Sequence, residues 1–341
     1  VCKYTFCETV VLAVPDQGRG SFIMSNRLAH VERVLTDAYS QSASSALAAS
    51  WRRSLVMYHL DPSRRRPSER LPEAQLKSCL EHSEALIRVS KERLDSLYTT
   101  VGSSGCGVFL TDAQGVIVDK RCSSSDAGFF KKCDLRRGAN WSEAAEGTNG
   151  IGTCLAEQRP VIIDRDQHFF ACHISMSCID APIFGSNGQL IGALDVSTAR
   201  LDHDSRMNAL ICASVHQIAQ QIETDMFQIA FSNKRLVMAS PNNADGCALF
   251  AVDEDDLVVG ATRAARRSVG LPKTGSFDPI PHADLINIVQ PECSLRGFDR
   301  GEKAAIKRAL SRSNGNVSQA AANLGVGRAT LYRRMKKLNL N

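Results

Sequence analysis

The sequence predicts an α+β fold for most of the chain, an antiparallel sheet flanked by helices, and an all-α helix-turn-helix module at the C-terminal end. Three patterns support this prediction. Short apolar runs separated by turn residues lie between positions 102 and 200. Long helical patterns flank these runs, and a basic helical pattern fills residues 301–341. An antiparallel sheet with helices at its ends is an α+β arrangement.

The apolar runs of the body are predicted to be strands. Two tight turns, Asp112-Ala113-Gln114-Gly115 and Gly185-Ser186-Asn187-Gly188, join the first and the last pair into hairpins. The predicted strands are residues 107–111, 116–118, 160–163, 181–184 and 190–196.

Two long helices are predicted around the sheet. The first runs from residue 72 to 101, and Leu80, Ile87, Leu94 and Val101 recur in it every seven residues, as in a coiled-coil seam. Packing onto its own domain is the other interpretation of that helix. The second helix carries apolar residues in steps of three and four, which suits a dimer seam or a core face: Ile211, Val215, Ile218, Ile222, Met226 and Ile229.

The C-terminal segment has the pattern of three short helices. An amphipathic stretch, 302–313, is stopped by Asn314-Gly315. Asn316 is predicted to cap the second helix, with Gln319 as the reciprocal partner of a capping box. Gly325 suits the positive φ of a tight turn. The third helix then places three apolar side chains on one side: Leu331, Met335 and Leu338.

Charge is concentrated in this segment. Residues 301–341 hold nine Lys or Arg against the single acid Glu302, a net charge of +8, whereas the whole chain is +5. The other 300 residues therefore carry −3. A cationic patch on one small module is typical of a protein that binds a polyanion, because each neutralised phosphate releases counterions. A solvated amphipathic helix is the simpler alternative.

Residues 315–321 and 328–334 resemble the Fis-type helix-turn-helix of bacterial enhancer-binding regulators. In that family the third helix enters the major groove of DNA. The resemblance implies base-reading or positioning roles for Arg328, Thr330, Tyr332 and Arg333, and backbone contacts for Asn316, Ser318, Lys336 and Lys337. Gly327 departs from the Ser or Asn that is frequent in the family, which predicts a weaker cap and one polar contact fewer.

Residues 50–223 resemble the GAF sensory domain of acetoin-type regulators. The resemblance rests on Trp51-Arg52-Arg53-Ser54, on Trp141-Ser142-Glu143 with Glu146-Gly147-Thr148-Asn149-Gly150-Ile151-Gly152-Thr153, and on His168-Phe169 and Cys178. It implies a small-molecule cup formed by one sheet face and the loops over it. The candidate effector-binding residues are Trp141, His168, His173 and Cys178.

The His and Cys residues also allow two other interpretations. Imidazole and thiolate are zinc and iron ligands, but the spacing of His168, Cys172, His173 and Cys178 fits no common zinc pattern. We therefore predict no metal and no cofactor beyond an unidentified effector. A redox-sensing role for other cysteines would require a lowered thiol pKa. The cysteines in question are Cys106, Cys122, Cys133 and Cys154.

The twelve cysteines are scattered without a short repeated spacing, and neither a signal peptide nor an apolar run of membrane-spanning length is present. These features favour reduced thiols in a cytoplasmic protein that is nucleoid-associated when bound to DNA.

Residues 248–267 resemble the first part of a PAS domain. The predicted domains are 1–70, a helical lead-in whose first 23 residues read as an overextended start; 71–235, the GAF-like domain; 240–271, a PAS-like remnant; 272–300, a linker; and 301–341, the helix-turn-helix.

The combination predicts a non-enzymatic, ligand-responsive transcriptional regulator that binds double-stranded DNA as a homodimer and contacts RNA polymerase or a related regulator. No Gly-x-x-x-x-Gly-Lys-Ser/Thr occurs, so the chain could not remodel sigma-54 polymerase by ATP hydrolysis alone. Two alternatives remain: a co-regulator or antagonist that forms mixed dimers with an ATPase-bearing relative, and a thiol-dependent methionine sulfoxide reductase.

Overall fold

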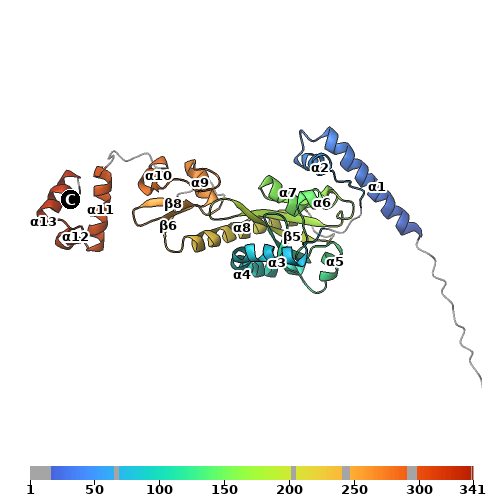
Figure 1. The fold of residues 1–341 in the computed structure, drawn as a ribbon, viewed down its shortest axis with the longest axis horizontal. Coiled ribbons are helices and arrows are strands. Elements are labelled where there is room, and N and C mark those ends of the chain that lie inside the picture. Colours follow the sequence, from blue (N-terminus) through green and yellow to red (C-terminus); the bar gives the residue numbers. More distant parts are fainter. Residues whose placement is uncertain are drawn as a thin grey trace, which may run out of the picture. The chain divides into compact units, whose positions relative to one another are not determined.

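The computed structural model describes residues 17–64, 69–200, 205–239, 246–289, 298–338 and 340. The chain divides into two compact units, one up to His282 and one from Ala283 onward. The ribbon in Figure 1 shows the first unit as a sheet with helices and the second as a group of helices. Each unit is described by itself.

The centre of the first unit is a five-stranded antiparallel sheet of order β2-β1-β5-β4-β3. Its strands are β1, Cys106–Asp112; β2, Ile117–Arg121; β3, Val161–Asp164; β4, Ser177–Phe184; and β5, Leu190–Thr198. Positive φ at Gly115 and Gly188 closes the two predicted hairpins. The predicted α+β architecture, with all five strands, is confirmed.

One face of this sheet is covered by helices α4, Glu84–Val101, and α8, Ser205–Ala230 (Figure 1). Leu94 and Val101 are buried there. The heptad positions therefore pack onto their own domain, in agreement with the second interpretation. The stripe of α8 likewise lies in this core up to Met226. Ile229, at its end, is exposed.

The helix predicted at 72–101 is in fact two helices. α3 spans Glu73–His82 and α4 begins at Glu84, with Ser83 between them at ψ 3°. The Ser83 amide still donates to the Cys79 carbonyl. The chain thus turns without a Gly or Pro, and the prediction of one continuous helix was wrong.

The opposite face of the sheet is covered by the short helix α7, Gly150–Glu157, with α6, Glu143–Glu146, beside it (Figure 1). Phe109, Trp141, Cys154 and Cys178 share the core of this face. Trp141 and His168 come from loops, whereas Cys178 comes from β4. This is the face on which the predicted cup lies.

The lead-in consists of helices α1, Gln17–Ser40, and α2, Ala46–Val56. Val34 and Trp51 of these helices form a small core with Phe169 and Phe170 of the central domain. Residues 17–23 belong to α1, so that part of the predicted overextended start is helical. Residues 1–16 lie outside the described residues.

After α8 the chain forms a second sheet, β6-β7-β8-β9, in which all pairs are antiparallel. Its elements are β6, Arg235–Met238; β7, Leu249–Val252; β8, Leu257–Ala261; helix α9, Arg263–Val269; and β9, Ile280–Pro281. The predicted strand, turn, strand and helix of the PAS-like remnant are thus present.

The stretch 272–300, predicted to be a linker, is partly ordered structure. Arg266, a buried side chain of α9, donates to the carbonyl oxygens of Ala261, Pro272 and Gly275. Strand β9 follows, and Pro281 fits there because an edge strand tolerates a residue without an amide hydrogen. Helix α10, His282–Val289, comes next, and residues 290–297 lie outside the described residues.

The C-terminal unit contains three packed helices: α11, Phe298–Arg312; α12, Val317–Asn323; and α13, Arg328–Lys337. Asn316 Oδ1 accepts from the amides of Ser318 at 3.0 Å and Gln319 at 3.2 Å, which confirms the predicted cap. The reciprocal bond is different, because the Asn316 amide donates to the Ser313 carbonyl. Gly325 has φ +64°, as the turn requires. The core contains Ile306, Ala309, Ala320, Ala321, Leu331, Met335 and Leu338.

Candidate effector cup and DNA-binding face

The four predicted cup residues lie together in the central domain. The rings of Trp141 and His173 are stacked with centroids 4.9 Å apart, and His168 meets His173 edge-on at 6.2 Å. Nε2 of His168 lies 3.3 Å from Sγ of Cys178. All four side chains are buried. The sequence therefore predicted their proximity, and their role in binding stays a prediction.

Hydrogen bonding sets the proton positions in this group. Nδ1 of His168 lies 2.8 Å from the Arg165 carbonyl oxygen, which can only accept, so Nδ1 carries a proton. Nε2 of the neutral ring then accepts from the Cys178 thiol. Burial lowers the pKa of His168 to about 4 and that of His173 to about 3, and it raises the pKa of Cys178 well above its ordinary value. These three side chains are thus uncharged at neutral pH, and the buried Glu146 carboxyl lies 3.8 Å from Nε2 of His173.

This chemistry differs from that of a metal or thiol-redox centre. Across the part of the chain that the structure describes, no three His, Cys, Asp or Glu side chains are placed so that they could hold a metal ion. Burial also raises the pKa of Cys106 to about 11 and that of Cys133 to about 12. A reactive cysteine needs its thiolate, which burial of this kind suppresses.

Two aspartates that sequence reasoning missed lie on the same face of the sheet. Asp180 of β4 and Asp195 of β5 are directly opposite each other in register. Alternation along each strand puts Asp180 on the side of Cys178, away from the core of α4 and α8. Both carboxyls are fully buried. A sequence signal existed, because each is an acidic residue inside an otherwise apolar predicted strand.

The surroundings of the two carboxyls are unequal. Oγ of Ser197 donates to Asp195, with distances of 2.8 and 3.0 Å to the two carboxylate oxygens. The Asp180 carboxyl is hydrogen-bonded to that of Asp195, and its oxygens receive no bond from any other donor among the described residues. Burial, followed by the charge of Asp195, holds the pKa of Asp180 well above its ordinary value. Burial raises the pKa of Asp195 to about 7, and its bond with Ser197 opposes that shift.

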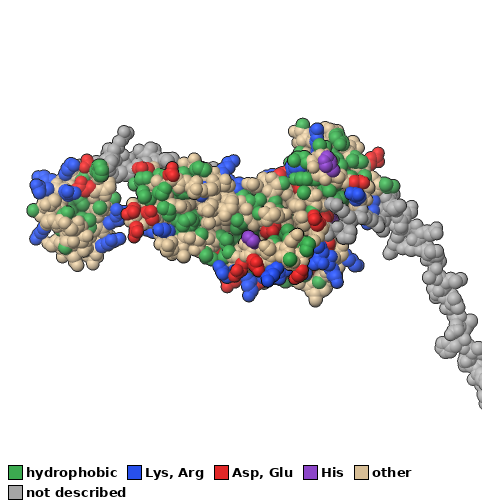
Figure 2. Space-filling view, viewed as in Figure 1, with side chains coloured by type: hydrophobic (Ala, Val, Ile, Leu, Met, Phe, Trp, Pro, Cys, Tyr) green, Lys and Arg blue, Asp and Glu red, His purple; other side chains and the backbone are tan. Residues whose placement is uncertain are grey.

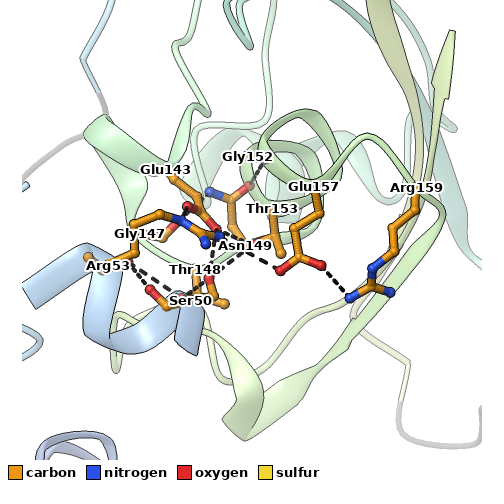
Figure 3. Close-up of polar contacts among 11 residues, drawn as sticks. Ser50, Arg53, Glu143, Gly147, Thr148, Asn149, Gly152, Thr153, Glu157 and Arg159 are labelled. Atoms are coloured by element: carbon orange, nitrogen blue, oxygen red, sulfur yellow. Dashed lines mark hydrogen bonds and ion pairs between the residues drawn. The ribbon is translucent and has the colours of Figure 1, made fainter. Parts of the chain in front are cut away.

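The lead-in helix α2 is joined to α6 by a buried carboxylate (Figure 3). Glu143, 3% exposed, accepts from Nε of Arg53 at 2.5 Å and from Nη2 at 2.8 Å. Ser50 Oγ at 2.6 Å and Thr153 Oγ1 at 2.9 Å also donate to it. We call Ser50, Arg53, Glu143 and Thr153 the α2 anchor. Two of the motifs behind the GAF resemblance are therefore partners of each other.

The glycine-rich motif at residues 147–152 has a structural role. Asn149 Oδ1 accepts from the Gly152 amide at 2.8 Å and so caps α7. Gly147 has φ +63°, in the left-handed region. A Cβ at Gly150 would lie 2.0 Å from Asp180 Oδ2, so only glycine lets α7 approach the sheet this closely. The motif shapes a turn and a helix start.

The lead-in helices also contact the second loop of the cup. Trp51 Nε1 donates to the Gln167 carbonyl oxygen at 2.9 Å, and His30 Nε2 lies 3.3 Å from the Phe169 carbonyl oxygen. Helices α1 and α2 are thus bonded to the loop that carries His168, and α2 is also bonded to α6, which follows Trp141 in the chain. A conformational change of this loop would therefore alter contacts made by both helices.

The third helix of the C-terminal unit has two distinct sides. Leu331, Met335 and Leu338 are buried, as predicted. Seven of the eight predicted DNA-contacting residues are exposed, and Thr330 is half-exposed. Figure 2 shows Lys and Arg side chains on the surface of this unit. The exposed seven are Asn316, Ser318, Arg328, Tyr332, Arg333, Lys336 and Lys337.

Some cations of this unit also have partners within it. The Arg328 guanidinium lies 5.6 Å from the centroid of the Tyr332 ring. Lys337 Nζ donates to Asp299 at 2.8 Å, and Arg334 to Glu302 at 2.8 Å. Gly327 provides no side-chain cap for α13, as its lack of a side chain predicts. Lys337 would have to exchange its carboxylate for a phosphate to contact DNA.

Among the described residues, none of the helices combines the length and the apolar character needed to cross a membrane.

Comparison with known families assigns both modules. Residues 85–225 match the GAF domain, and residues 299–338 match the bacterial regulatory protein, Fis family. The chain thus combines a GAF domain with a Fis-type helix-turn-helix, the domain set of a bacterial transcriptional regulator. Only residues 226–298 separate the two matches, so no ATPase domain lies between them.

Individual relatives agree with this class. The chain is 32% identical over 263 residues to the acetoin catabolism regulatory protein of Cupriavidus necator, covering 76% of this chain and 37% of that protein. It is 26% identical over 151 residues to the acetoin dehydrogenase operon transcriptional activator AcoR of Bacillus subtilis, covering 44% of this chain and 25% of AcoR. The chain therefore spans about a third or less of these relatives' length.

A solved structure has a similar fold over about two thirds of the chain. The Escherichia coli DhaR(N)–DhaL complex contains a chain with a TM-score of 0.50 and 15% identity, covering 68% of this chain and 79% of the other. At that identity the likeness concerns the fold alone. The resemblances drawn from the sequence, to GAF and to Fis-type domains, are confirmed by the family matches.

Proposed function

We propose that this protein is a sequence-specific DNA-binding transcriptional regulator whose GAF domain senses a small molecule. The observation that carries the proposal is the two-sided helix α13. It buries Leu331 and Met335 while Arg328 and Arg333 extend into solvent on a unit with a large positive charge. This is the arrangement of a recognition helix, which reads base edges with one side and packs on its own unit with the other.

The effector that this proposal favours is a small uncharged molecule. Two relatives are named for acetoin metabolism, and the cup wall of His168, His173 and Cys178 is neutral at physiological pH. These three neutral side chains give an anionic ligand no countercharge. In this proposal the effector changes the loops bonded to α1 and α2 and so shifts the population of DNA-binding conformations.

Assembly and location are further parts of the proposal. A palindromic operator is read by a symmetric dimer, so the protein would act in the cytoplasm as a homodimer and contact RNA polymerase or a related regulator. Sedimentation with and without operator DNA tests the dimer, and co-purification tests the polymerase contact.

The sulfoxide-reductase alternative is not favoured. Every described thiol with a shifted pKa has that pKa raised, which disfavours the reactive thiolate.

Selection of bound sequences from a random duplex pool, followed by affinity measurement between 50 and 200 mM salt, tests the DNA assignment. Several phosphate contacts would weaken binding on the order of 10³-fold across that range. Enrichment of one palindromic sequence is the expected result. Binding that is absent, or that does not depend on salt, would overturn the proposal.

A further inference from the structure

Two ion pairs join the start of α11 to the end of α13. Lys337 Nζ donates to Asp299 Oδ1 at 2.8 Å. Arg334 Nη1 donates to Glu302 Oε1, also at 2.8 Å. On each helix the two partners are three residues apart, a spacing that puts them on the same side of the helix. The pairs therefore form two successive links between α11 and the predicted recognition helix.

The acids of these pairs are scarce in this part of the sequence. Residues 298–341 contain ten Lys or Arg and only two acidic side chains, Asp299 and Glu302. Five of the ten cations lie outside α13, yet both acids bind cations of α13. The negative charge of the segment is thus concentrated on the helix whose outer side is predicted to contact DNA.

The two pairs divide the cations of α13 into two groups. The helix has five Lys or Arg, and two of them are the paired Arg334 and Lys337. The other three, Arg328, Arg333 and Lys336, make no ion pair with a described carboxylate. These three are exposed and can contact phosphates directly. The paired two must first leave a carboxylate.

The pairs are weak enough to be exchanged. Lys337 and Asp299 have side-chain exposures of 65% and 43%, and Arg334 and Glu302 of 52% and 22%. Exposed ion pairs contribute little to stability and are screened by salt. A phosphate can therefore displace either carboxylate, but the displaced carboxylate remains beside the DNA and is repelled by it. A cation with its acid thus adds no net positive charge to the DNA-binding face.

We propose that Asp299 and Glu302 compete with DNA phosphates for two cations of α13, and so limit the DNA affinity of the protein and its salt dependence. This inference rests on the proposed DNA-binding function and adds the residues that restrain it. Two linked units bind with a high effective concentration. Weak binding by one unit therefore makes occupancy of an operator depend on both units of the proposed dimer.

Binding of the full chain to a random-sequence DNA duplex, measured by fluorescence anisotropy over a range of salt concentrations, tests the proposal. Asp299→Asn keeps the shape of the side chain and removes its charge, which releases Lys337 for one more phosphate contact. The slope of log affinity against log salt should become steeper by about 0.9, and binding near 0.1 M salt should tighten up to about eightfold. Glu302→Gln should have a similar effect through Arg334. Unchanged slopes in both variants would overturn the proposal.

Removal of any acid raises the net charge, so the cation partner has to be tested as well. In a Lys337→Gln background, Asp299→Asn should no longer steepen the slope. A gain that persists there would show a long-range charge effect and would also overturn the proposal. Glu81→Gln, at an exposed residue of α3, makes the same charge change and should leave the wild-type slope unaltered.

The wild-type measurement separates this proposal from the one on which it rests. If wild-type protein shows no salt-dependent DNA binding, the proposed function fails. If the wild type binds and the Asp299→Asn and Glu302→Gln slopes equal its own, only the competition by the two acids is refuted. Circular dichroism of each variant checks that the helices are retained.

Discussion

The central domain and the C-terminal unit place their polar side chains in opposite ways. The central domain buries Glu143, Asp180, Asp195 and His168 on the side of one sheet. The C-terminal unit has an apolar core of Ala, Ile, Leu and Met, and its cations are at the surface. Buried polar groups couple recognition to the stability of the fold, whereas surface cations can be changed with little effect on folding. Variants in the two regions should therefore have separable consequences.

The largest effect is expected at the α2 anchor. Arg53→Ala would leave Glu143 buried without its cation, which should lower the free energy of unfolding by about 3–5 kcal/mol. Denaturant titration of the central-domain transition measures this. The neighbouring Arg52→Ala is the matched control, since Arg52 is exposed and its side-chain bond among the described residues is to Ser42, so its cost should stay within about 0.5 kcal/mol. Equal losses in the two variants would contradict a structural anchor.

The second prediction concerns the surface of α13. Arg333→Ala should weaken operator binding by about 1–3 kcal/mol because it removes a major-groove or phosphate contact. The free energy of unfolding should change by less than about 0.5 kcal/mol, since the side chain is exposed. Fluorescence anisotropy with labelled operator measures the first quantity and thermal denaturation the second. Lys307→Ala, an exposed cation on α11, should affect binding less. If Arg333→Ala lost as much unfolding free energy as binding free energy, the surface cations could not be changed independently of folding, and the difference between the two regions would not hold.

A smaller effect is expected at the cap of α12. Asn316→Ala removes the acceptor for the Ser318 and Gln319 amides and should cost about 1 kcal/mol. Hydrogen exchange at those two amides in the full chain measures the local loss. Asn316→Asp keeps an acceptor and should preserve protection, while its charge should weaken binding to phosphate. Faster exchange in the Asp variant than in the Ala variant would refute the capping role.

The fourth prediction is a difference in pH dependence. Asp195 has a folded-state pKa of about 7, above the unfolded value, so its burial costs stability as pH rises from about 4 to about 7. His168, with a pKa of about 4, acts in the opposite sense and costs stability as pH falls below about 6.5. Asp195→Asn removes the first contribution, together with the effect of the Asp195 charge on the pKa of Asp180, and leaves that of His168. Near pH 5 its unfolding free energy should therefore fall more steeply with acid than that of the wild type, by at most about 1.4 kcal/mol per pH unit.

Urea titrations at half-unit pH intervals give that slope, and Asp278→Asn serves as the reference. An unchanged slope in Asp195→Asn would mean that this carboxyl does not hold its proton in the folded state.

The features that the sequence predicted best are local ones. The turn at 185–188, the cap at Asn316 and the two sides of α13 each depend on residues within one or two turns of chain, and all were correct. The helix break at Ser83 was missed because no Gly or Pro marks it. Strand β9 was missed because its only signal is a partner some 20 residues earlier, in β8.

In the site, too, local features were predictable from the sequence and features that depend on distant residues were not. Family motifs brought Trp141, His168, His173 and Cys178 together correctly, but their spacing alone could not show that they are uncharged and buried. Asp180 was missed because its significance depends on Asp195, which faces it across the sheet and is hydrogen-bonded to it. Such a pairing emerges only when two strands are in register.

The α2 anchor determines the smallest fragment of this chain that can be transferred to another regulator with its buried contacts intact. Arg53 and Glu143 are 90 positions apart, and the GAF match begins only at residue 85. A chimera joined at that point would carry Glu143 without its guanidinium and expose Phe169 and Phe170, which Trp51 now covers. A graft of the sensor should therefore include both lead-in helices, from α1 onward.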